Sequence, residues 1–244
     1  GGVVDRGEDG EGCSPAHGLG LPGPSWVFST DAQAPTPRCR QGGPGGLQKG
    51  GFARRVRDVV REHPEAEVQV WAEDEGRFGL IPSCRRIWAP KGKRPTMSSR
   101  RRYEWRYLFS FVRPQTGETI NIIGSTVSAA IMSAVLQEFA DDAGLGAMRR
   151  AVLVLDGAGW HAAKDLRVPE GIHLVFLPPY SPELQPAERL WPIVNEAVAN
   201  RGFHTIGDLE KAVERRCLYM DAHKAYVKSL TCYHWWPQEP SCEG

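Results

Sequence analysis

The sequence predicts an α/β fold with a mixed five-stranded sheet flanked by helices, and two observations carry this prediction. Between residues 68 and 125, successive segments are rich in β-branched and aromatic residues and are joined by short turns, as in an antiparallel meander. After residue 125 the pattern changes, and helical periods alternate with continuous apolar runs that are typical of buried strands.

The first half of the chain begins with a short amphipathic helix, predicted by Phe52, Val56 and Val59 and ended by Pro64. The strand over residues 68–74 follows. Its alternation places two sets of side chains on opposite faces: Val68, Val70, Ala72 and Asp74 on one, and Trp71, Glu73 and Glu75 on the other. Further strands are predicted over residues 86–89, 103–112 and 119–125.

The second half alternates helices with buried strands. Helices are predicted over residues 128–142, near 162–166 and over 186–200, with strands over 151–155 and 172–177. Pro192 has no N–H for the carbonyl of Glu188, so we expect the helix to be irregular there. Thr205 is expected to cap a final helix. A meander followed by alternating helices and strands matches a ribonuclease-H-like arrangement.

Composition divides the chain into three parts. Residues 1–50 contain 13 Gly and 6 Pro, cannot bury enough apolar surface to offset their ordering entropy, and are predicted to be a disordered tail. The folded domain is expected over residues 51–225, with a C-terminal tail over 226–244. The first residue is Gly rather than Met, so we expect a fragment or a processed chain.

Charge and cysteine usage narrow the class of protein. The net charge is +1, but nine basic residues stand between positions 85 and 106 with one acid, Glu104. They are Arg85, Arg86, Lys91, Lys93, Arg94, Arg100, Arg101, Arg102 and Arg106. Such a cluster predicts phosphate binding, and a solvated basic hairpin is the alternative on charge alone. The six cysteines form no C-x-x-C pair, and neither a signal peptide nor a membrane-spanning run is visible, so we expect a reduced cytoplasmic protein without a membrane partner.

Three carboxylates stand at positions suited to metal chemistry. Asp74 ends a strand on its apolar face, Asp156 follows five apolar residues, and Glu188 comes early in a helix that Pro186 begins. Each also has a structural reading: a solvated strand end, an Asp-Gly turn, and a favourable helix N-terminal acid. Glu183 is a rival for the third position. His161 and Glu75 are candidate accessory residues, and His161 is expected to orient water or a substrate phosphate, or to be structural.

Three motifs give the chain a family resemblance. They are Asp74-Glu75-Gly76-Arg77-Phe78-Gly79-Leu80, the segment from Trp88 to Pro95, and the run from Leu177 to Trp191. Together they resemble the catalytic domain of the IS630/Tc1/mariner transposases, the DDE superfamily endonucleases, over about residues 51–220. Departures are Gly157 and Gln185, where that family often has Asn, and a tail over 1–50 without the helix-turn-helix that its members use to recognise element ends.

The resemblance implies DNA cleavage and strand transfer by a triad of Asp74, Asp156 and Glu188 that binds two Mg²⁺ ions, with Mn²⁺ as a substitute. It also implies DNA as the partner, both transposon ends and target, a homodimer in a synaptic complex, and a nucleoid-associated protein of the bacterial cytoplasm. The alternatives are another ribonuclease-H-like metal nuclease, such as a structure-selective ribonuclease or a resolvase, and a truncated, inactive remnant that only binds DNA. A glycoside hydrolase with paired carboxylates is remote.

Overall fold

The computed structural model describes residues 51–93, 95–97, 102–157, 161, 164–178 and 181–237. The predicted tail over residues 1–50 lies outside this part of the chain, as do Arg94, Arg100 and Arg101. Of the helical segment expected near 162–166, residues 162 and 163 also lie outside it, and residues 164–166 form no helix. The chain divides into two compact units. The described residues of the first are 85–93, 95 and 96, and the second holds every helix and strand named below.

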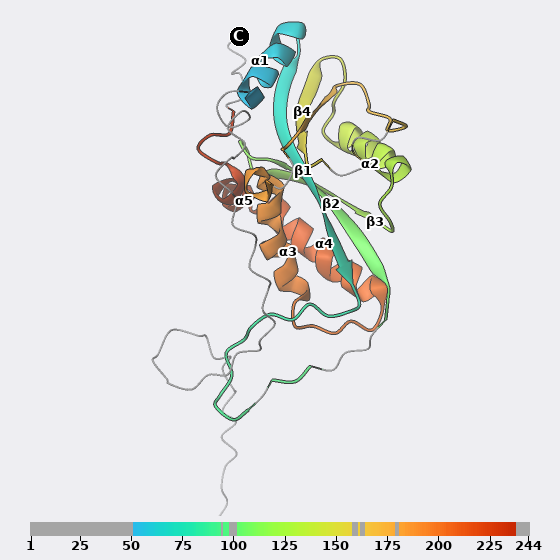
Figure 1. Cartoon of the computed structure of the whole chain (residues 1–244), viewed down its shortest axis with the longest axis vertical. Helices are drawn as coiled ribbons and strands as arrows, with labels where there is room; N and C mark the ends of the chain where they lie inside the picture. The colour runs from blue at the N-terminus through green and yellow to red at the C-terminus, as the bar shows by residue number, and fades with distance from the viewer. Residues whose placement is uncertain are drawn as a thin grey trace, which may run out of the picture. The chain divides into compact units, whose positions relative to one another are not determined.

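The second unit is built on a five-stranded mixed sheet with the order β3-β2-β1-β4-β5 (Figure 1). The strands are β1 (Glu67–Gly79), β2 (Trp105–Arg113), β3 (Glu118–Gly124), β4 (Arg149–Leu155) and β5 (Ile172–Phe176). β1, β2 and β3 are antiparallel neighbours, whereas β4 runs parallel to β1 and β5 runs parallel to β4. This topology confirms the expected ribonuclease-H-like fold.

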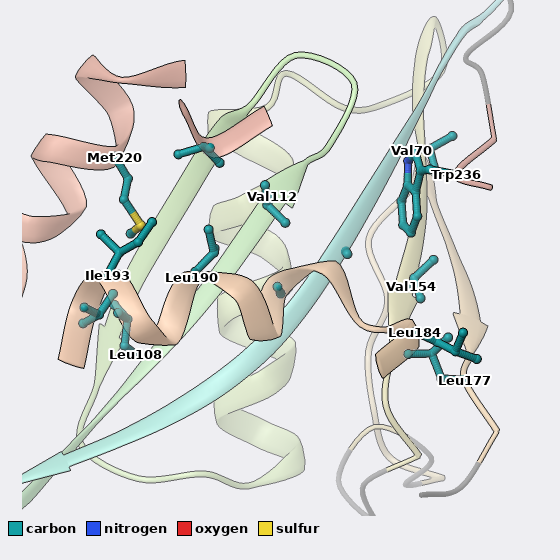
Figure 2. Packing of buried hydrophobic residues seen from close by; sticks show 14 of the residues in the cluster. Val70, Leu108, Val112, Val154, Leu177, Leu184, Leu190, Ile193, Met220 and Trp236 are labelled. Carbon is teal, nitrogen blue, oxygen red and sulfur yellow. The ribbon is translucent and has the colours of Figure 1, made fainter. Parts of the chain in front are cut away.

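The two faces of the sheet pack against different helices. α2 (Ala129–Asp142) covers one face, and the other is covered by α1 (Phe52–Glu62), α3 (Trp191–Val198), α4 (Ile206–Ala222) and α5 (Lys224–Thr231). The predicted alternation in β1 is confirmed. Val68 and Val70 belong to the hydrophobic cluster on the face that carries α1, α3, α4 and α5, whereas Trp71 packs edge-on against Phe139 of α2 on the other face. Figure 2 shows residues of the first of these clusters, in which Leu190 and Ile193 face the sheet.

Local signals set the helix ends. The Ser128 hydroxyl accepts a hydrogen bond from the Ile131 N–H at the start of α2, and Gly144 follows the helix with φ +64°. Thr205 caps α4 as predicted, in a reciprocal capping box with Asp208. No described helix has both the length and the apolarity needed to cross a bilayer.

Two features differ from expectation. Residues 86–89 form no strand, and the side chains of Ile87 and Trp88 are exposed. Strand propensity depends on a neighbouring strand that offers hydrogen bonds, and Pro82 and Pro90 restrict this short run on both sides. The packed core also continues past residue 225, since Val227 and Trp236 are buried in it and the Trp236 ring meets Phe52 edge-on.

We expect Leu136→Ala to lower the free energy of unfolding by about 2–5 kcal/mol, because it empties a fully buried position between α2 and the sheet. Leu218→Ala is the matched control: it is the same change in a helix, but Leu218 is 69% exposed, so the loss should stay within about 0.5 kcal/mol. Chemical denaturation of both variants measures the difference, and equal losses would contradict the packing described.

Candidate active site

The two aspartates stand at matching positions on neighbouring strands. The parallel pairing of β1 with β4 ends at Ala72 and Val154, and Asp74 and Asp156 each lie two residues beyond that pair. Past this point β1 continues, paired with β2, while β4 ends at Leu155. The sheet therefore opens where the two carboxylates stand, at the carboxyl ends of its parallel strands, a common location for sites in α/β proteins.

Asp74 points to the face that carries α3. Its Oδ2 accepts a hydrogen bond of 2.7 Å from the indole Nε1–H of Trp191, the first residue of α3. Burial raises the pKa of Asp74 to about 7; the Trp191 hydrogen bond opposes this shift, and the carboxylates of Glu188 and Glu75 add to it. The Glu188 carboxylate therefore lies close enough to Asp74 for the two negative charges to repel each other.

Glu188 is held by an irregular helix start. Residues Pro186–Leu190 form a 3-10 turn that leads into α3, and the N–H of Trp191 donates to the carbonyl of Glu188. This confirms the irregularity expected from Pro192, which cannot donate to that carbonyl. Burial raises the pKa of Glu188, and the Asp156 carboxylate raises it further. Asp74 and Asp156 are therefore electrostatically coupled through Glu188, and the role of this coupled acidic group as a metal-binding triad stays a prediction.

His161 lies on the other side of Asp156, buried against three acids. Its Nδ1 is 2.9 Å from Asp156 Oδ1, and its Nε2 is 2.8 Å from Glu75 Oε1 and 3.7 Å from Glu73 Oε2. Burial alone would lower the pKa of His161, but the hydrogen bonds to Asp156 and Glu75, with the charge of Glu73, raise it to about 10. The imidazolium form therefore offsets part of the negative charge.

Sequence reasoning gave no role to Glu73, which it placed on the Trp71 face of the first strand. Its side chain is fully buried and neither carboxylate oxygen has a hydrogen-bond partner among the described residues. Burial, followed by the charge of Glu75, raises the pKa of Glu73 well above its ordinary range, which favours the neutral acid. The alternation that put Glu73 on the face of Trp71 was the available signal. Within the described residues, Glu73, Glu75 and His161 have ligand atoms close enough to share a metal ion.

Gln185 and Trp191 have roles that their residue types did not reveal. The Gln185 side chain is buried and donates to the carbonyl of Glu73 at 2.7 Å, which ties the loop before Glu188 to β1. The Trp191 ring packs against the core, and its indole N–H donates to Asp74. The rival ligand Glu183 is exposed in the 3-10 turn Pro182–Leu184.

The predicted basic cluster divides by its surroundings. Arg85, Arg86, Lys91 and Lys93 are exposed, in a segment without helix or strand. Arg102 pairs with Glu104 at 2.5 Å and donates to the carbonyl of His204, and Arg106 pairs with Glu210 of α4. The last two arginines therefore fasten the start of β2 to neighbouring elements, and phosphate binding by any of the nine stays a prediction.

Comparison with known families agrees with this geometry. The family model of the DDE superfamily endonucleases matches residues 69–210, more than half of the chain and all three members of the coupled acidic group. The chain belongs to the DDE superfamily endonuclease family, which confirms the resemblance that the motifs predict.

Individual relatives are more distant. The uncharacterized protein y4pE/y4sA of Sinorhizobium fredii (strain NBRC 101917 / NGR234) is 38% identical over 106 residues, covering 43% of this chain and 77% of the relative. Among solved structures, the Mos1 transposase paired-end complex with left transposon end has a TM-score of 0.46 and 14% identity, covering 75% of this chain and 60% of that one. The mariner Mos1 paired end complex with Mg has a TM-score of 0.48 and 14% identity, with 86% and 64% covered. The chain thus spans about three fifths of those Mos1 chains.

We expect Asp74→Asn to stabilise the metal-free protein, and more so at high pH. The pKa of Asp74 is about 7 in the folded state against an ordinary 3.8, so the folded state prefers the neutral acid. Its contribution to stability is complete below pH 3.8 and is lost as pH rises through 7. The asparagine stays neutral, so its gain over the wild type should be about 3 kcal/mol larger at pH 8 than at pH 5. Denaturation in EDTA at both values measures it, and a gain independent of pH would contradict the burial of a charged Asp74.

Proposed function

We propose that this chain is the catalytic domain of a DDE transposase, which cuts DNA and joins the cut end to a target with the aid of divalent metal ions. The observation that carries the proposal is geometric: Asp74 and Asp156 each lie two residues beyond the last β1–β4 pair, and Trp191, which binds Asp74, also donates its N–H to the carbonyl of Glu188. Membership of the DDE superfamily endonucleases supports the same three residues as the working triad.

The residues present fit a divalent metal. Carboxylate oxygens are the ligands that Mg²⁺ and Mn²⁺ prefer, and burial together with mutual repulsion raises the pKa of Asp74 and Glu188 when no cation is bound. A divalent cation would remove that repulsion. We propose two ions of Mg²⁺, replaceable by Mn²⁺; when bound, they would stabilise the charge that develops on the attacking and leaving oxygens of a phosphodiester.

The protein's own groups hold this arrangement. Asp74 would offer its carboxylate in the orientation set by the indole N–H of Trp191, and Glu188 would approach from the irregular helix start that Pro192 imposes. Hydrolysis breaks the P–O3′ bond, with a water oxygen joining phosphorus and a 3′-hydroxyl released. In strand transfer that hydroxyl attacks a second phosphodiester in line and displaces its 3′ oxygen. Transposon ends and target DNA are the proposed substrates, and a homodimer in a synaptic complex is the proposed assembly.

We expect Asp156→Asn to reduce Mn²⁺-dependent cleavage of a duplex that carries the element's inverted repeat to the level seen without metal. The carboxamide keeps the size of the side chain and loses the negative ligand. Gel analysis of the cut strands measures the rate, and circular dichroism checks that the fold survives. Cleavage at the wild-type rate would move the site elsewhere.

Replacement of glutamate by glutamine at residue 188 or at residue 183 shows which of the two is the third carboxylate of the site. Glu188→Gln should abolish cleavage, because it removes a carboxylate of the coupled group, whereas Glu183→Gln changes an exposed side chain and should leave the rate unchanged. The reverse result would make Glu183 the third ligand. Cleavage of the inverted repeat in preference to a scrambled duplex separates a transposase from a general nuclease, and binding without cleavage indicates a remnant.

DNA affinity should depend steeply on salt, because lysine and arginine side chains that bind phosphates release counterions. We expect replacement of the exposed Arg85, Arg86, Lys91 and Lys93 by alanine to weaken binding to repeat and scrambled duplexes alike. The slope of log affinity against log salt should flatten by about one unit for each phosphate-binding side chain that is removed. Titrations across salt measure the slope. An unchanged slope would remove these residues from the DNA interface.

A further inference from the structure

Asp156 lies where the sheet no longer supports the chain. The pairing of β4 with β1 ends at Val154, β4 itself ends at Leu155, and the Asp156 side chain is 51% exposed. A half-exposed carboxylate on a strand end can adopt several rotamers unless a neighbouring group binds it. A metal ligand needs one defined orientation, so the groups that hold Asp156 matter to the site.

His161 holds both the side chain and the main chain of Asp156. Its Nδ1 is 2.9 Å from Asp156 Oδ1 and 3.2 Å from the carbonyl oxygen of the same residue. One N–H shared between these two acceptors fixes the carboxylate relative to its own backbone.

The His161 ring is itself anchored to the centre of the sheet. The side chain has no exposed surface, and its Nε2 lies 2.8 Å from Oε1 of Glu75, whose side chain is 7% exposed. Glu75 belongs to β1 and pairs with Phe109 of β2, within the antiparallel ladder of the sheet. A chain of hydrogen bonds thus runs from a rigid central strand through His161 to the end of β4, across the point where the two strands separate.

We propose that His161 is a positioning residue: fastened to Glu75, it fixes the Asp156 carboxylate in the orientation that binds a divalent cation. The inference rests on the proposed function. In it, His161 acts on a protein side chain, Asp156, and not on the substrate. A ring that is fully buried and has both nitrogens at carboxylate oxygens is not placed to orient water or a substrate phosphate, which was one of the two roles that the sequence left open for His161.

Trp191 and His161 then have the same kind of role, each holding one of the two aspartates. Trp191 donates to Asp74 from one side of the sheet, and His161 binds Asp156 from the other. Groups that orient metal ligands in this way typically change metal affinity by about 10–100-fold when they are removed. The same range is expected for His161, without loss of the ligand itself.

The test measures Mn²⁺ binding to the full chain by isothermal titration calorimetry. His161→Phe keeps the ring and removes both nitrogens, and Glu75→Ala removes the anchor; each should weaken Mn²⁺ binding by about 10–100-fold. Glu75→Gln keeps an oxygen acceptor and should stay close to the wild type. The matched control is His173→Phe on β5, the same change at a ring that lies beside His63, and it should leave Mn²⁺ affinity unchanged.

A second background shows whether His161 acts through Asp156. When Asp156→Asn has already removed the carboxylate, adding His161→Phe should cause no further loss of Mn²⁺ affinity. The effects of two substitutions in one hydrogen-bond network do not add when one residue acts through the other. Thermal unfolding of every variant accompanies the titrations, and the Glu75→Ala and Glu75→Gln pair carries the test if His161→Phe does not fold.

The outcomes separate the two proposals. Mn²⁺ binding that survives unchanged in Asp156→Asn overturns the triad and hence the proposed function. Binding that is weakened in Asp156→Asn but unchanged in His161→Phe and Glu75→Ala overturns the positioning role alone. Loss of one ion from the stoichiometry in His161→Phe, with unchanged affinity for the rest, would make His161 a metal ligand and also overturn it.

Discussion

Five acidic residues share one end of the sheet, and their mutual repulsion is the constraint on which the site depends. They are Glu73, Asp74, Glu75, Asp156 and Glu188, and the pKa of three of them is raised. The protein offsets the charge in stages. Burial favours the neutral form of Glu73, the imidazolium of His161 lies between Glu75 and Asp156, and the indole of Trp191 binds Asp74. The repulsion that remains between Asp74, Asp156 and Glu188 is the kind that a divalent cation would relieve, as the proposed function requires.

The sheet and the helices have separate tasks in this arrangement. The parallel register of β1 and β4 brings Asp74 and Asp156 to the same end of the sheet. This requires the pairing of segments that are distant in the sequence. Glu188 arrives from a turn that cannot become a regular helix, because Pro192 leaves the Glu188 carbonyl to the N–H of Trp191. The same tryptophan also binds Asp74, so one residue follows the 3-10 turn, begins α3 and donates a hydrogen bond to the Asp74 carboxylate on β1.

Much of the fold and of the candidate site could be predicted from the sequence, because the signals are local. The buried runs around residues 151–155 and 172–177, the cap at Thr205 and the effect of Pro192 each act within a few residues. The errors came from contacts between distant segments. The run at 86–89 has strand-forming residues and forms no strand, Glu73 is buried by the rest of the fold, and the chain beyond residue 225 enters the core through Trp236. Periodicity indicated the face on which Glu73 lies, but not which distant segments would cover or pair with these residues.

The late position of Trp236 in the core has a consequence for synthesis. Phe52, the first residue of α1, packs against Trp236. The packing of the first helix therefore depends on a residue that lies almost at the end of the described chain. Glu188 itself follows both aspartates along the chain. A nascent polypeptide on the ribosome therefore carries Asp74 and Asp156 long before it can close the core around them. The contact between Phe52 and Trp236 can form only after these late residues have emerged from the ribosome, so the core beneath the candidate site is completed late in synthesis.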